Sequence, residues 1–87
     1  MHEASLMNDL MKKIDVVLDA EQADRAVAVK VTLGALSHMS PDHFREHFDL
    51  AAQGTRMAGA RLDIVALDDI HHPMAQDILL EHVEVEV

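Results

Sequence analysis

The stretch from residue 25 to residue 33 most constrains the fold, because its side chains alternate strictly along the chain. One side of the alternation consists of branched aliphatic residues: Val27, Val29, Val31 and Leu33. The other side carries Ala28, Lys30 and Thr32. A two-residue period of this kind is typical of a strand with one buried face. The pattern therefore predicts a half-buried β-strand.

Two segments flanking this strand have the period of amphipathic helices. The first covers residues 4–20, and its apolar stripe consists of Leu6, Met7, Leu10, Met11, Ile14, Val17 and Leu18. We interpret its methionines as core residues rather than soft-metal ligands. In the second segment, Ser40 is a predicted N-cap and Pro41 a predicted first helical residue. Its predicted buried stripe consists of Phe44, Phe48 and Ala51, with Ala52 beside it and Gly54 closing the helix.

Two further strands are predicted in the second half of the chain. The first opens at Gly59, and in it Leu62, Ile64 and Ala66 alternate with Asp63, Val65 and Leu67. The last strand has an apolar face made of Leu79, Val83, Val85 and Val87. A crossover of about 25 residues favours parallel pairing of the first two strands, whereas the short connector 70–76 favours an antiparallel hairpin of the last two.

The predicted fold class is therefore α/β (α+β) in a single small domain. Two helices pack on one face of a mixed three-stranded sheet, in the order helix, strand, helix, strand, strand. With 87 residues and only two aromatic ones, the domain has a single core made mainly of aliphatic side chains.

Composition limits the classes of function. The chain has no cysteine, which excludes disulfides, thiolate catalysis and cysteine-ligated zinc. Its net charge of −9 argues against nucleic acid and anionic membrane as partners. Because neither a membrane-spanning run nor a signal peptide pattern is found, we expect a cytoplasmic location. No phosphate-binding glycine loop or catalytic triad is recognisable, so an enzyme is not indicated.

The first three residues, Met1-His2-Glu3, combine donor groups that suit one metal ion. We expect Met1 to be the true start of the chain. A methionine before a bulky histidine should also escape removal, so we expect the free amine to belong to Met1. Its amine, the backbone nitrogens of His2 and Glu3, and the His2 imidazole can close fused chelate rings. A planar nitrogen set favours Ni(II) or Cu(II) over tetrahedral zinc. A histidine at position 2 also occurs by chance, so the motif alone leaves both interpretations open.

Other histidines are weaker candidate metal ligands. His43 and His47 are four residues apart in the second predicted helix, a spacing that can chelate a metal, and Glu46 is close. No third ligand is obvious, so partly covered, hydrogen-bonded imidazoles beside the buried stripe are the simpler interpretation. The pair His71-His72 falls in the connector, where we expect exposure rather than specific metal binding.

Several segments match a known family in order along nearly the whole chain. They are residues 1–7, 29–37, 40–42, Phe44 with Phe48, 53–55, 59–62 and 79–86. In this order they resemble the HypA/HybF nickel metallochaperones of nickel–iron hydrogenase maturation. The resemblance implies a carrier that binds nickel through Met1, His2 and Glu3, with His2 essential. It also implies delivery to a hydrogenase large subunit or a related client, with a nickel-handling GTPase as upstream partner.

The chain departs from this family in one important respect. Family members carry a zinc ribbon of paired Cys-x-x-Cys motifs between the last two strands, where this chain has only the connector 70–76. We therefore expect a HypA-like nickel-binding domain over residues 1–87 without structural zinc. His43, Glu46 and His47 also stand where the family usually has small or apolar residues.

Two functions from different classes follow from these observations. The first is a nickel carrier that retains the metal-binding half of the family. The alternative is a metal-independent HypA-like interaction or regulatory module that binds a protein partner, for which the acidic surface is a candidate. Pairing of the last strand between two copies would give a homodimer.

Overall fold

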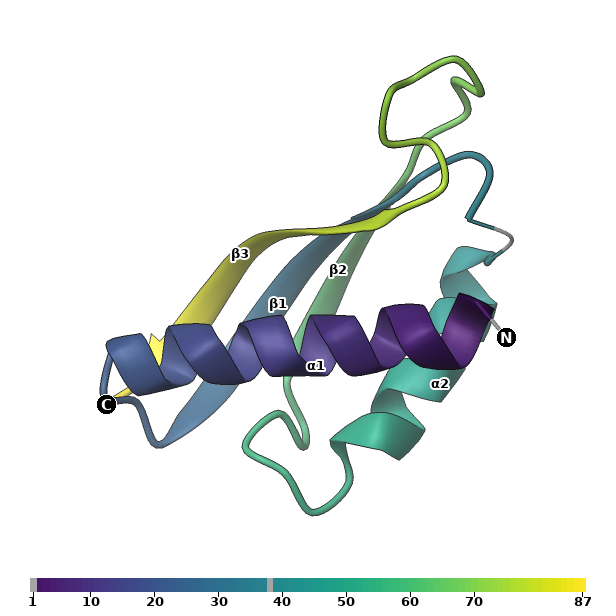
Figure 1. Ribbon diagram of the computed structural model, residues 1–87. Coiled ribbons are helices and arrows are strands. Elements are labelled where there is room, and N and C mark those ends of the chain that lie inside the picture. The colour runs from purple at the N-terminus through teal and green to yellow at the C-terminus, as the bar shows by residue number, and fades with distance from the viewer. Residues whose placement is uncertain (1, 38) are drawn as a thin grey trace.

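The computed structural model describes residues 2–37 and 39–87, with only the backbone described for residues 2–4. Its elements are, in chain order, α1 (His2–Ala20), β1 (Arg25–Leu33), α2 (Pro41–Ala52), β2 (Arg61–Ala66) and β3 (Ile78–Glu86). Both helices cover the same face of the three-stranded sheet (Figure 1). The predicted fold class and element order are confirmed. Within the part of the chain described, neither helix is long and apolar enough to cross a membrane.

The order of the strands in the sheet is β2-β1-β3. β1 lies in the centre and pairs in parallel with β2, as the crossover length predicted. The predicted hairpin of the last two strands is wrong, because β3 lies on the opposite edge and pairs antiparallel with β1. The connector between β2 and β3 therefore passes the end of β1. It is held there because the N–H groups of Gly34 and Leu36 donate to the carbonyls of Asp77 and Ala75.

A β-bulge in β1 changes which residues face the core. Ala26 pairs with Val85 and Ala28 with Glu84, so Val27 has no partner on β3. Such an extra residue moves all following side chains to the other face of the sheet. Buried Ala26 is therefore followed on the core face by Val29. The prediction that Val27 belongs to the core is wrong, since its side chain is 36% exposed.

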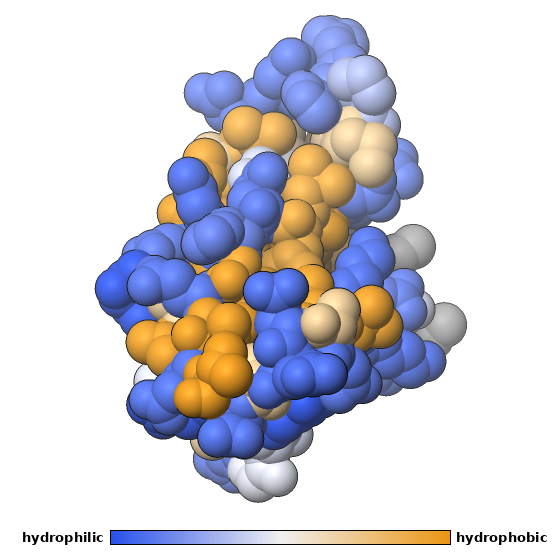
Figure 2. Space-filling view, turned by 90° about the vertical axis from the view of Figure 1, so that its left-hand side faces the viewer, coloured by the Kyte–Doolittle hydropathy of each residue, from blue (hydrophilic) through white to orange (hydrophobic). Residues whose placement is uncertain are grey.

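A second register shift has the same effect in β3. Lys30 pairs with His82 and Val31 with Leu80, which leaves Glu81 unpaired. Leu80 therefore packs against the core together with Val83 and Val85, in place of the predicted Leu79. Figure 2 views the molecule from the side of β3, where apolar residues reach the surface between polar ones.

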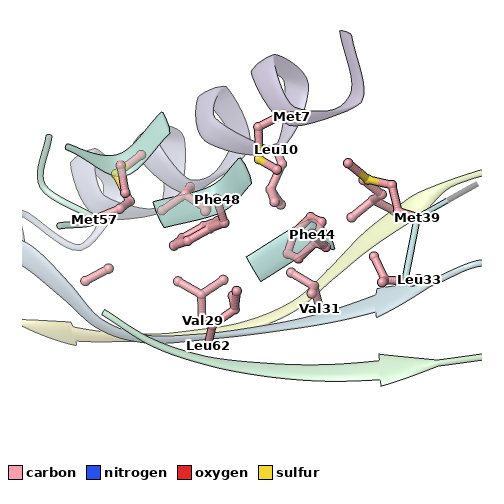
Figure 3. Packing of buried hydrophobic residues seen from close by; sticks show 14 of the residues in the cluster. Met7, Leu10, Val29, Val31, Leu33, Met39, Phe44, Phe48, Met57 and Leu62 are labelled. Carbon is pink, nitrogen blue, oxygen red and sulfur yellow. The ribbon is translucent and has the colours of Figure 1, made fainter. Parts of the chain in front are cut away.

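The core lies between the helices and the sheet (Figure 3). Phe44 and Phe48 of α2 are 0% and 1% exposed, and their ring centroids are 6.1 Å apart. They lie over Val29 and Val31 of β1 (Figure 3). Helix α1 contributes Met7, Leu10, Ile14 and Leu18 of its predicted apolar stripe to the core, and all four are buried. Ala52 is the third buried residue of α2, whereas the predicted Ala51 is exposed.

The start of α2 is the one predicted from the sequence. Pro41 opens the helix, and the Ser40 hydroxyl accepts a hydrogen bond of 3.2 Å from the His43 N–H.

We expect Ser40→Ala to lower the free energy of unfolding by about 1 kcal/mol, because the His43 N–H loses its acceptor. Urea denaturation measures this difference. Ser40→Asp should retain most of the stability, and equal losses for both variants would contradict a capping role.

Candidate metal site

The candidate nickel ligands lie at the beginning of α1, which starts at His2. Met1 lies outside the described residues, and the side chains of His2 and Glu3 are not described. The first four N–H groups of an α-helix have no acceptor within the helix. The backbone nitrogens of His2 and Glu3 are therefore not committed to intrahelical hydrogen bonds, and a metal can bind them without displacing one.

Planar chelation nevertheless requires a local change at this end of α1. Two successive backbone nitrogens close a five-membered ring with a metal only when the ψ angle between them is near zero. In an α-helix ψ is about −42°. Metal binding through the nitrogens of His2 and Glu3 would therefore unwind the start of the helix. The buried residues Met7 and Leu10 would hold the remainder in place.

His43 and His47 lie together on one flank of α2. Their rings are stacked, with centroids 4.5 Å apart and an interplanar angle of 17°. His43 is exposed and His47 half-buried. Among the described side chains, no group of three or more histidines, cysteines or carboxylates could hold a metal ion. The neighbouring Glu46 is thus not brought together with the two imidazoles as a third ligand.

Two side chains of the connector region, those of Asp69 and His72, have a structural role that sequence reasoning missed. The Asp69 carboxylate accepts a hydrogen bond of 2.9 Å from the His71 N–H. Nδ1 of His72 accepts one of 3.0 Å from the Met74 N–H. Side chains that accept from a backbone N–H two residues further on are typical of turns, and the aspartate is the recognisable signal. Nδ1 of His72 thus belongs to the turn, whereas His71 takes part in it only through its backbone.

Arg56 fastens the loop after α2 to the end of α1. Its Nη2 lies 3.1 Å from the Asp15 carboxylate and 2.9 Å from the Asp19 carboxylate. The hydrogen bond to Asp15, followed by that to Asp19, raises the pKa of Arg56 above its ordinary value. A basic group whose pKa is raised in the folded state contributes its full stabilisation at every pH below its ordinary pKa. This contribution is lost only as the pH rises through the raised pKa. The contribution of the Arg56 guanidinium is therefore constant across the physiological range.

A groove of about 280 Å³ runs between α1 and the edge strand β3. Its lining consists of Val17, Leu80, Glu81, His82 and Val83. The apolar residues visible on this side of the molecule in Figure 2 are flanked by polar ones. Glu84 and Glu86 extend the acidic character of the strand. This surface suits a protein partner better than a metal ion.

The fold matches that of a solved metallochaperone. The solution structure of the Ni metallochaperone HypA from Helicobacter pylori superposes with a TM-score of 0.79 and 18% sequence identity. The match covers 99% of this chain and 98% of that one. At this level of identity, the likeness establishes the shared fold of a small α/β domain.

Sequence comparison then identifies the family. Residues 1–71 match the family described as "Hydrogenase/urease nickel incorporation, metallochaperone, hypA". The chain belongs to the HypA family, which confirms the resemblance found in the sequence.

Curated relatives agree with this assignment. The hydrogenase maturation factor HypA of Methylocella silvestris is 36% identical over 64 residues, which cover 74% of this chain and 57% of the relative. That of Desulfitobacterium hafniense is 36% identical over 67 residues, which cover 77% and 59%. The chain thus matches little more than half the length of these relatives.

Proposed function

We propose that this protein is a cytoplasmic nickel carrier and not an enzyme. It binds one Ni(II) ion at Met1-His2-Glu3 and holds or delivers the ion for maturation of a nickel–iron hydrogenase or a related metalloenzyme. The observation that carries this proposal is the family match, which begins at residue 1 and includes the whole donor set. The start of α1 at His2 gives further support, because it leaves backbone nitrogens without intrahelical acceptors.

Four nitrogen donors have separate roles in this proposal. They are the Met1 amine, the His2 amide and imidazole, and the Glu3 amide, and each must be unprotonated to bind the metal. A planar nitrogen set suits Ni(II), and Cu(II) binds it more tightly by the general order of affinities. The Glu3 carboxylate is left beside the metal, where it can contact the partner that receives the ion. The proposed partners are a hydrogenase large subunit or related client and a nickel-handling GTPase.

We also propose that this domain needs neither a zinc ribbon nor structural zinc. The 87 residues contain no cysteine. The connector 70–76 stands between β2 and β3 in place of an inserted domain, and β3 completes the sheet by pairing with β1. Buried aliphatic residues and the two phenylalanines make up the core, which supports this proposal.

Replacement of His2 tests the nickel site. With a native N-terminus, Ni(II) titration should show one tightly bound equivalent in a yellow, diamagnetic complex. His2→Ala should weaken binding more than about 100-fold, or at least about 2.8 kcal/mol, because the imidazole donor and its chelate ring are lost. One residue added before Met1 should have a similar effect, since it converts the amine into an amide.

His71→Ala is the matched control for this experiment, because His71 is an exposed histidine whose side chain is outside the proposed site. It should bind Ni(II) as tightly as the unmodified protein. If the N-terminally extended protein also retained full affinity, nickel would bind elsewhere and the proposed site would be wrong.

The groove between α1 and β3 favours a second candidate function, a metal-independent interaction module. Its apolar lining includes Val17 and Val83, and the exposed residue Glu81 also lines it. Such a surface fits a partner with apolar and basic side chains. If His2→Ala supported hydrogenase maturation in cells while a folded Val17→Lys variant did not, the interaction module would replace the carrier as the better explanation.

A further inference from the structure

We propose that His43 and His47 form a second metal-binding site, at which two imidazoles hold a Ni(II) ion beside the beginning of α1. The binding itself does not depend on the N-terminal chelate. Only its role, as a holding site from which the ion passes to Met1-His2-Glu3, rests on the proposed function.

The two rings are close enough for both to bind one metal ion once they rotate out of their stack. Residues four apart in a helix lie on the same side, one turn from each other. The His43 and His47 rings are stacked with centroids 4.5 Å apart. Imidazole nitrogens bind divalent metals at about 2.0–2.1 Å, so two donors on one ion lie within about 4.2 Å of each other. The lone pair of an imidazole nitrogen lies in the plane of its ring, so both side chains must rotate out of the stack for their nitrogens to converge on one ion.

The pair lies on the side of α2 that is turned away from β2. Arg45 donates a hydrogen bond of 3.2 Å to the Leu62 carbonyl, which shows which side of α2 faces β2. At 3.6 residues per turn, His43 and His47 are each about 160° around the helix from Arg45. The partial burial of His47 agrees with a neighbouring element on that flank.

That neighbouring element is α1, which packs against α2. Figure 1 shows the first turns of α1 crossing α2 near the start of the latter. Met7 of α1 lies above Phe44 of α2 (Figure 3), which places this crossing one to two turns after the start of α1 at His2. A metal held by the imidazole pair would therefore lie close to the backbone nitrogens proposed for the N-terminal site.

The chemistry of the two sites differs in a way that gives transfer a direction. Two imidazoles leave most coordination positions of Ni(II) to water, so the ion is held weakly and can be exchanged. The N-terminal set supplies four nitrogens in a plane and holds the ion more tightly. The exposed carboxylates of Asp42, Glu46 and Asp49 on the same helix attract divalent cations to this region. Nickel therefore passes from the pair to the N-terminus.

The test begins with a protein in which one residue precedes Met1, so that the N-terminal chelate is blocked. Titration with nickel chloride should show one remaining equivalent, bound weakly as a pale green, paramagnetic ion. On this background, His43→Gln and His47→Gln should each weaken the remaining binding at least about tenfold, because each removes one of the two donors. Glutamine keeps the helix intact, and circular dichroism verifies the fold. His71→Gln is the matched control and should change nothing.

The result that would overturn the site is an extended protein whose Ni(II) binding is absent or unchanged by either glutamine variant. This failure is distinguishable from failure of the proposed function. The double variant His43→Gln, His47→Gln with a native N-terminus still forms the yellow complex if that function is correct.

A separate experiment tests whether the His43–His47 pair lies close to the N-terminal site. With two equivalents of Cu(II) bound to the protein with its native N-terminus, electron paramagnetic resonance should show dipolar coupling between the ions. Coupling lost in His43→Gln supports the holding role. Two bound copper ions without coupling would overturn it.

Discussion

Phe48→Ala is expected to lower the free energy of unfolding by about 3–5 kcal/mol, among the largest effects available from one substitution in this domain. The Phe48 side chain is 1% exposed and packs between α1 and the central strand β1. Removing its ring leaves a cavity that the surrounding aliphatic side chains fill only in part. Stabilities of about 0.05–0.15 kcal/mol per residue amount to about 4–13 kcal/mol for the whole domain, so the loss is a large fraction.

Urea denaturation followed by circular dichroism measures this loss, and α2 itself supplies a control. Leu50 is two residues further along the same helix but 62% exposed. Leu50→Ala should therefore change the stability by no more than about 0.5 kcal/mol. Similar transition midpoints for the two variants would show that the packing of α2 on the sheet is incorrect.

Gly34→Ala is expected to cost about 1–3 kcal/mol or more, for a different physical reason. A Cβ at this position would overlap the backbone carbonyl of Ala75 and crowd that of Met74. Neither obstacle is a side chain that can rotate away, so the connector must move as a whole. That movement would strain the hydrogen bonds from the N–H groups of Gly34 and Leu36 to the connector carbonyls.

Gly59→Ala separates this effect from a general intolerance of glycine replacement. Gly59 has a φ of 77°, and its Cβ would meet open space. Gly59→Ala should therefore lower the free energy of unfolding only by the cost of placing alanine at a positive φ, about 1–2 kcal/mol. Hydrogen exchange of the Leu36 and Asp77 amides should accelerate in Gly34→Ala but not in Gly59→Ala. Equal exchange in both variants would contradict the anchoring of the connector to the end of β1.

The candidate nickel site can be proposed from the sequence because its donors are consecutive. Met1, His2 and Glu3 need no tertiary contact to come together, and the family match extends over them. The His43–His47 pair was likewise visible as helical spacing. Its stacking and its place on the side of α2 turned away from β2 were not visible, because they depend on how α2 packs against its neighbours.

Local patterns in the sequence determined the two helices, the three strands and the family of this protein. Each of these follows from neighbouring residues: periodicity for the stripes of α1 and α2, and capping chemistry for Ser40 and Pro41. The parallel pairing of β1 with β2 followed from the length of the crossover between them.

Only the tertiary structure decided the place of β3 and the faces of its side chains. Pairing β3 with β1 instead of β2 depends on the close approach of the connector to Gly34, a contact between residues about 40 positions apart. The two bulges, at Val27 of β1 and Glu81 of β3, each leave one residue without a partner on the other strand. An alternating pattern does not show where a strand carries an extra, unpaired residue, so alternation alone placed Val27 and Leu79 on the wrong face.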